Sequence, residues 1–152
     1  MESNLYLAYG SNLNLDQMAK RCPTAKVVGT YNLEGYQLLF KGPHDSAVAT
    51  IEAKENSQVP VLIWEIKPDD ELALDYYEGW PYLYRKETIK VTVGKRLVPA
   101  MVYLMNGNRP LGLPSCYYYS IILEGYKAAE FDVEILRQAV SDSTNGELDS
   151  SV

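Results

Sequence analysis

Two short segments of the chain hold residues whose types and spacing could do chemistry. The first is Tyr6-Leu7-Ala8-Tyr9-Gly10-Ser11-Asn12-Leu13, an apolar run that ends in Gly-Ser-Asn. A tight turn at such a glycine can point several backbone N–H groups into one space, where they bind carboxylate or phosphate oxygens without a basic side chain. Taken alone, a bare Gly-Ser-Asn is better explained as an ordinary connection between a strand and a helix.

The second segment places a glutamate where its charge is disfavoured. Glu78 ends a predicted helix and precedes Gly79, so it lies at the negative end of the helix dipole, which costs a carboxylate about 0.3–1 kcal/mol. Aromatic residues on both sides also disfavour the charged form. Both effects suit a residue that transfers protons near neutral pH. Taken alone, the segment is more simply explained by an exposed glutamate or by an ion pair with Arg85.

The composition predicts a soluble globular protein of one domain. The 152 residues are 47% hydrophobic and 22% charged, and the net charge of -6 argues against nucleic acid as a partner. No signal peptide is evident at the N-terminus, and the apolar run at residues 59–66 is too short to span a membrane. We therefore expect a cytoplasmic protein without a membrane partner. The 13 tyrosines, against 2 phenylalanines, indicate that some hydroxyl groups line a polar pocket.

Cysteine and histidine are too sparse to predict a metal or redox site. Cys22 and Cys116 are far apart in the sequence, and His44 is the single histidine. Metal sites and Cys–His nucleophile pairs need closer groupings of these residues. We expect neither a metal nor another cofactor.

The order of the predicted elements indicates an α+β fold. The patterns predict strands at 4–9, 25–41, 47–53, 59–66, 83–93 and 97–105, and helices at 14–21, 67–78, 115–124 and 132–140. Gly35 predicts a bulge or a hairpin where the second strand bends, and residues 94–96 predict a hairpin turn. Residues 141–152 are polar and without periodicity, so we expect a domain at 1–140 and a disordered tail at 141–152.

Three motifs together resemble the γ-glutamylcyclotransferase family. They are the Tyr6–Leu13 segment, the pair Glu78-Gly79 after a short helix, and Pro114-Ser115-Cys116-Tyr117-Tyr118 at a helix start. The motifs occur in the family's order and cover the chain from about Tyr6 to Val140. The resemblance implies a small closed or nearly closed mixed β-barrel with short surrounding helices.

The resemblance also implies an activity and a set of site residues. Such enzymes release 5-oxoproline from a γ-glutamyl amino acid or amine when the α-amino group attacks the γ-carbonyl, a lyase- or acyltransferase-type cyclisation without cofactor. Glu78 is then the catalytic residue that transfers protons. A homodimer is compatible with the resemblance, although the sequence leaves the oligomeric state open. The implied substrate-binding residues are Tyr6, Tyr9, Gly10, Ser11, Asn12, Leu13, Tyr84 and Tyr118.

Two alternatives remain open at the level of sequence. In the first, the protein binds a small acidic metabolite without catalysis, and Glu78 only contacts an ammonium group of this ligand. In the second, the reaction is retained but the leaving amine differs, for instance a γ-glutamyl-protected amine or a biosynthetic intermediate. Residues 80–84 and 106–113 are our candidates for contacts with the leaving group.

Overall fold

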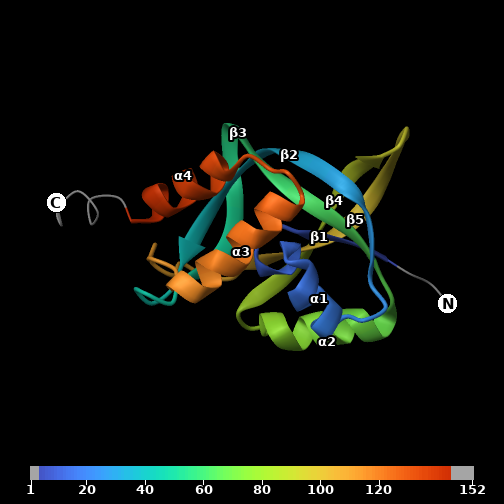
Figure 1. Ribbon diagram of the computed structural model, residues 1–152, viewed down its shortest axis with the longest axis horizontal. Helices are drawn as coiled ribbons and strands as arrows, with labels where there is room; N and C mark the ends of the chain where they lie inside the picture. The colour runs from blue at the N-terminus through green and yellow to red at the C-terminus, as the bar shows by residue number, and fades with distance from the viewer. Residues whose placement is uncertain (1–3, 145–152) are drawn as a thin grey trace.

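The computed structural model describes residues 4–144 as one five-stranded sheet with helices packed around it (Figure 1). The elements, in chain order, are β1 (Asn4–Ala8), the 3-10 helix η1 (Ser11–Leu13), α1 (Leu15–Arg21), β2 (Lys26–Lys41), β3 (Val48–Ile66), α2 (Pro68–Glu78), β4 (Tyr84–Val93), β5 (Arg96–Met105), α3 (Cys116–Ala128) and α4 (Val133–Ser143). Within residues 4–144, no helix has the length and apolar character needed to cross a membrane.

The sheet is mixed and open. Its strand order is β2-β3-β1-β5-β4, with β1 antiparallel to β3 and parallel to β5. The predicted α+β class is therefore confirmed, but the predicted closed or nearly closed barrel is not, because the sheet is not closed: no pairing in the described chain joins the edge strands β2 and β4. On β3, the short strand β1 pairs only with residues 62–66. The first half of β3 therefore pairs with β2 on one side and with no strand of the described chain on the other.

The β2–β3 pair departs from the sequence-based prediction in one respect. The strands expected at 47–53 and 59–66 form the single strand β3, although its register with β2 breaks over residues 54–57. Asn56 has a positive φ of 63° in this stretch. The predicted bulge is confirmed, because the register shifts between Glu34 and Tyr36 and Gly35 has a φ of 84°.

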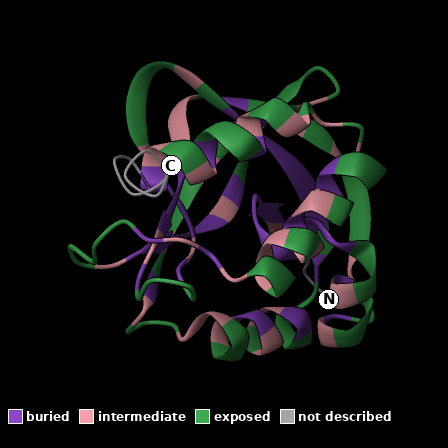
Figure 2. Cartoon of the chain, turned by 60° about the vertical axis from the view of Figure 1, so that its left-hand side comes forward, coloured by how far each residue is buried: buried purple, intermediate pink, exposed green. Residues whose placement is uncertain are grey.

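The helices begin where the sequence predicts capping residues. The side chains of Asn14, Ser115 and Asp132 accept hydrogen bonds from backbone N–H groups in the first turns of α1, α3 and α4. Gly79 ends α2 in the left-handed conformation, with a φ of 68°. The burial pattern in Figure 2 places the buried residues on the strands and on the inward faces of the helices. Helix α3 packs on η1, which fixes the turn after β1.

The contact between α3 and η1 requires a glycine at position 125. A Cβ atom there would lie 2.6 Å from the Cβ of Leu13 and 2.8 Å from its carbonyl carbon. We expect Gly125→Ala to lower the free energy of unfolding by up to about 2 kcal/mol, because overpacking costs ~1–3 kcal/mol and helix propensity returns only ~1 kcal/mol. Urea denaturation measures this change. The exposed Lys127→Ala on the same helix is the control, and an unchanged or higher stability of Gly125→Ala would contradict the prediction.

The folded domain extends past the predicted boundary at residue 140. Helix α4 continues to Ser143, and Ser143 and Thr144 are buried, so the predicted disorder is wrong for 141–144. The reason is a hydrogen bond across the fold, since the backbone N–H of Phe40 donates to the Ser143 hydroxyl at 2.8 Å. The remainder of the predicted tail, residues 145–152, lies outside the described residues.

Ser143→Ala should therefore destabilise the protein although it lies near the end of the chain. The substitution leaves the buried N–H group of Phe40 without its acceptor, and such a loss costs about 1–3 kcal/mol. Urea denaturation should show this loss for Ser143→Ala and almost none for the exposed Ser141→Ala. Equal stabilities of these two variants would show that the hydrogen bond contributes nothing.

Candidate functional site

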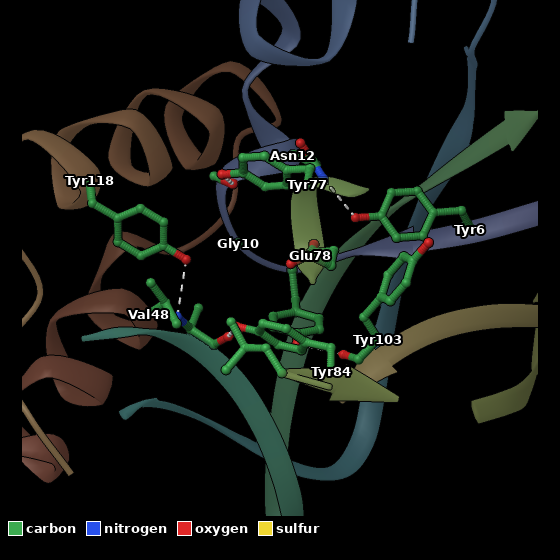
Figure 3. Close-up of a pocket in the computed structure, with 13 residues that line it drawn as sticks. Tyr6, Gly10, Asn12, Val48, Tyr77, Glu78, Tyr84, Tyr103 and Tyr118 are labelled. Carbon is green, nitrogen blue, oxygen red and sulfur yellow. Dashed lines mark hydrogen bonds between the residues drawn. The ribbon is translucent and has the colours of Figure 1, made fainter. Parts of the chain in front are cut away.

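A cavity of about 260 Å³ lies where the end of β1, η1, the C-terminal end of α2 and the starts of β3, β4 and α3 meet (Figure 3). Glu78 and all of the predicted substrate-binding residues except Leu13 line it. The fold thus brings together three segments that are far apart in the sequence. The lining also includes residues that the sequence analysis did not identify: Val48, Ala49, Tyr77 and Tyr103.

The turn after β1 presents backbone N–H groups beside this cavity. Within the described chain, the N–H groups of Gly10, Ser11 and Asn12 have no hydrogen-bond acceptor. The N–H of Leu13 instead donates to the Gly10 carbonyl at 3.0 Å, and its side chain is buried under α3. A Cβ atom at position 10 would lie 3.2 Å from the Cβ of Ala49, so glycine allows the close approach to β3. The turn can bind an anion through residues 10–12, without Leu13.

The side chain of Asn12 holds this turn in place and leaves the Tyr6 hydroxyl hydrogen unused. The Asn12 Oδ1 accepts a hydrogen bond from Arg21, and because a guanidinium only donates, this contact fixes the orientation of the amide. The Nδ2 group then donates to the Tyr6 hydroxyl oxygen at 2.9 Å. The Asn12 carbonyl accepts from Trp64 Nε1 at 3.1 Å. The polar atoms of the Asn12 side chain are thus engaged within the protein, whereas Tyr6 can still donate into the cavity.

The hydroxyl groups of two cavity tyrosines form hydrogen bonds with the backbone of Ala49. The N–H of Ala49 donates to the Tyr118 hydroxyl oxygen at 3.0 Å, and the Tyr84 hydroxyl donates to the Ala49 carbonyl at 2.6 Å. Tyr9 similarly donates to the carbonyl of Tyr103 at 2.6 Å. The hydroxyl hydrogens of Tyr84 and Tyr9 are therefore used by the backbone, while Tyr118 keeps its hydrogen for a ligand.

Burial keeps the cavity tyrosines neutral. It raises the pKa of Tyr6 well above its ordinary value, and the nearby Glu78 carboxylate raises it further. Burial also raises the pKa of Tyr118, against the opposing effect of the Ala49 N–H. Both side chains consequently remain hydrogen-bond donors at neutral pH.

Glu78 points into the centre of the cavity from the end of α2 (Figure 3). It is partly buried, and within residues 4–144 its carboxylate has neither a hydrogen-bond donor nor an ion-pair partner. The ion pair with Arg85 considered above does not form, because Arg85 Nε pairs with Glu87 at 2.9 Å. Burial raises the pKa of the Glu78 carboxyl to about 7, while Arg21 acts in the opposite direction. Glu78 can therefore both accept and release a proton near neutral pH.

Of the lining residues that the sequence analysis did not identify, one could have been found from its position in the sequence and the others could not. Tyr77 directly precedes Glu78, so its place in the sequence already connected it with the site. Tyr103 donates to Asp75 Oδ1 at 2.6 Å, and neither this contact nor the path of β3 past Val48 has a local signature.

The two segments proposed to contact the leaving group have different outcomes. Leu83 and Tyr84 line the cavity, but no residue of 106–113 does. Within residues 4–144, no group of three His, Cys, Asp or Glu side chains is arranged to bind a metal ion.

Comparisons with known proteins point to one family. The family model described as "Gamma-glutamyl cyclotransferase, AIG2-like" matches residues 6–120. The chain is 27% identical to a gamma-glutamylcyclotransferase from Bos taurus over 154 aligned positions, covering 95% of this chain and 81% of the relative. It is 29% identical over 136 positions to the Homo sapiens protein of that name, covering 83% and 71%. A solved structure titled "Gamma-glutamyl cyclotransferase" superposes with a TM-score of 0.76 at 26% identity, covering 91% of this chain and 86% of the other.

Proposed function

Because this chain belongs to the gamma-glutamyl cyclotransferase, AIG2-like family, we propose that it converts a γ-glutamyl amino acid or γ-glutamyl amine into 5-oxoproline and a free amine. One observation carries the proposal. A glutamate without a partner in the described chain, whose pKa is raised to about 7, faces the same small cavity as a turn whose backbone N–H groups have no acceptor in that part of the chain. The reaction needs both features, because the substrate carries a carboxylate and its ammonium group must lose a proton.

In the proposed mechanism Glu78 accepts protons from the attacking nitrogen and donates them to the leaving nitrogen. Its carboxylate takes a proton from the α-ammonium of the substrate, and the resulting amine attacks the γ-carbonyl carbon. A carbon–nitrogen bond closes the five-membered lactam, and the electrons of the carbonyl move to its oxygen. When the carbonyl re-forms, the bond to the leaving nitrogen breaks, and Glu78 gives its proton to this nitrogen. The Glu78 carboxylate then takes the second proton from the attacking nitrogen, which leaves the lactam N–H, and passes it to the free amine, which departs as an ammonium ion.

The remaining residues of the cavity bind and orient the substrate in this proposal. The N–H groups of residues 10–12 bind the α-carboxylate or the oxyanion, and the free hydroxyl hydrogens of Tyr6 and Tyr118 donate to the same oxygens. Tyr9 and Tyr84 shape the wall. The volume of about 260 Å³ favours a folded γ-glutamyl group in which amine and carbonyl meet. Such orientation can contribute up to about 7–11 kcal/mol to lowering the barrier.

The test is direct detection of 5-oxoproline. The purified protein is incubated with a panel of γ-glutamyl dipeptides and γ-glutamyl amines, and the products are measured by mass spectrometry. Formation of 5-oxoproline with the matching free amine supports the proposal and gives the preferred leaving group. Calorimetric binding of these compounds without any product would instead favour the non-catalytic binding protein.

A further inference from the structure

Arg21 does not line the cavity, yet it contacts two of the elements that form it. It is the last residue of α1, and one of its guanidinium nitrogens donates to Asn12 Oδ1 while another donates to Gln17 Oε1 at 2.7 Å. Its guanidinium carbon lies 3.5 Å from the centroid of the Tyr77 ring, in a cation–π contact. Arg21 therefore connects the anion-binding turn, through Asn12, with the end of α2, through Tyr77.

Tyr77 completes this connection from the other side. Its hydroxyl group shares a hydrogen bond with the Ser11 hydroxyl at 2.8 Å, and Tyr77 is the residue immediately before Glu78. The planar guanidinium thus lies against a ring that itself reaches the turn. A planar fork that stacks on a ring while it donates to two acceptors suits arginine, because the compact ammonium of lysine can donate hydrogen bonds but has no plane to stack.

The charge of Arg21 is not neutralised by a nearby acid. Arg85 and Arg137 pair with Glu87 and Glu134, whereas no carboxylate of the described chain lies within ion-pair distance of Arg21. Its positive charge is thus available to act on Glu78, the residue that follows Tyr77 in the chain.

We propose that Arg21 is a positioning residue of the cavity, which fixes the anion-binding turn relative to Glu78 and supplies the positive charge that keeps this glutamate available as a base. The role of Glu78 as a base rests on the proposed function, whereas the contacts of Arg21 and its charge are independent of that function. Arg21 acts through Asn12, Tyr77 and Glu78, without contact to the substrate.

The surroundings of Glu78 leave this task to Arg21. Apart from Glu78 itself, the titratable groups that line the cavity are tyrosines. One is Tyr77, against which Arg21 stacks. Burial raises the pKa of the others, so they carry no charge at neutral pH; they are Tyr6, Tyr9, Tyr84, Tyr103 and Tyr118. Burial raises the pKa of Glu78, and Arg21 is the described residue whose charge lowers it. Without Arg21, the carboxyl would hold its proton to a higher pH.

The experiment compares Arg21→Gln, Arg21→Lys and Lys20→Gln in the full chain. Lys20→Gln is the matched control, because it removes the same charge from an exposed position of the same helix. The titration of the Glu78 side chain is followed by carboxyl carbon-13 NMR, with Glu78→Gln to assign the signal. The dependence of kcat/KM on pH is measured for each variant with a substrate found in the panel above.

The expected results separate charge from geometry. Arg21→Gln moves the Glu78 titration midpoint and the acidic limb of kcat/KM to higher pH, and lowers kcat/KM on the order of ten- to a hundredfold. Arg21→Lys keeps the midpoint near the native one but still lowers kcat/KM about tenfold or more, because the planar fork is lost. Lys20→Gln matches the native protein in both measurements.

Two results would overturn the inference, and the first of them is independent of the proposed function. An unchanged Glu78 midpoint in folded Arg21→Gln removes the role of the charge, and this titration requires no substrate. Native kcat/KM in Arg21→Lys removes the role of the fork, and this variant also serves if Arg21→Gln does not fold. Failure of the proposed function looks different: no compound of the panel yields 5-oxoproline, while the Glu78 midpoint still moves in Arg21→Gln.

Discussion

Glu78→Gln is expected to lower the rate of 5-oxoproline formation by on the order of 10²–10⁴, the usual contribution of a positioned general acid or base. Glutamine has nearly the same size and fills the same place in the cavity, but it cannot accept the proton of the substrate ammonium. The loss should fall mainly on kcat, because residues 10–12, Tyr6 and Tyr118 still bind the substrate. Rates are followed by mass spectrometry with a compound that the native protein turns over.

The control for this prediction is Glu55→Gln, which removes an exposed glutamate on β3 that does not line the cavity. It should leave the rate unchanged. Near-native turnover by folded Glu78→Gln would end the assignment of Glu78 as the proton-transferring residue. Glu78→Ala adds a second comparison: a binding protein should lose affinity for its ligand, whereas the enzyme should lose turnover with binding partly kept.

Glu78→Gln is also expected to stabilise the protein above pH 7. Burial raises the pKa of Glu78 from 4.5 to about 7, so folding is penalised whenever this group must be ionised in the native state. The difference corresponds to up to about 3 kcal/mol at roughly 1.4 kcal/mol per pH unit. Glu78→Gln removes this penalty. A gain in stability together with a loss of rate is the behaviour of a residue kept for function.

The sign of the effect gives the prediction its pH dependence. Between pH 4.5 and about 7 the native state binds more protons at Glu78 than the unfolded state, so the stability contributed by this group falls as the pH rises. The difference between Glu78→Gln and the native protein should be small at pH 4.5, grow through this window, and level off by pH 8. Urea denaturation at several pH values measures this difference, in which other titrating groups cancel. A difference independent of pH would contradict it.

The elements near the site could be predicted because their signals are local. Asn14, Ser115 and Gly79 mark helix ends through their own side chains or backbone, and the structure places each where the sequence indicated. Glu78 could be singled out in the same way, because its position at a helix end is itself a local property. The hairpin of β4 and β5 turns at Gly94, as predicted.

The parts that could not be predicted depend on contacts between distant segments. Nothing local to Arg21 shows that it stacks on Tyr77, since the two are brought together only by the packing of α1 near the end of α2. Ser143 has a polar neighbourhood in the sequence and becomes buried only because β2 passes beside α4. The open sheet is of the same kind, because closure is decided by the limited pairing of β1 with β3 and not by any strand alone.

The hydrogen bonds of two tyrosines to the Ala49 backbone help to explain why the chain is rich in tyrosine. Ala49 lies opposite Phe40 in the β2–β3 ladder, and its N–H and carbonyl point away from β2, to a side where no strand of the described chain pairs with it. In a continuous sheet the next strand would satisfy these groups, and here tyrosine hydroxyls take its place. The cavity therefore lies where the next strand of a continuous sheet would be. The two rings beside Ala49, those of Tyr84 and Tyr118, must each carry a hydroxyl to bind its peptide groups. Phenylalanine would fit the volume but leave buried peptide groups unsatisfied, which accounts in part for a chain with 13 tyrosines and 2 phenylalanines.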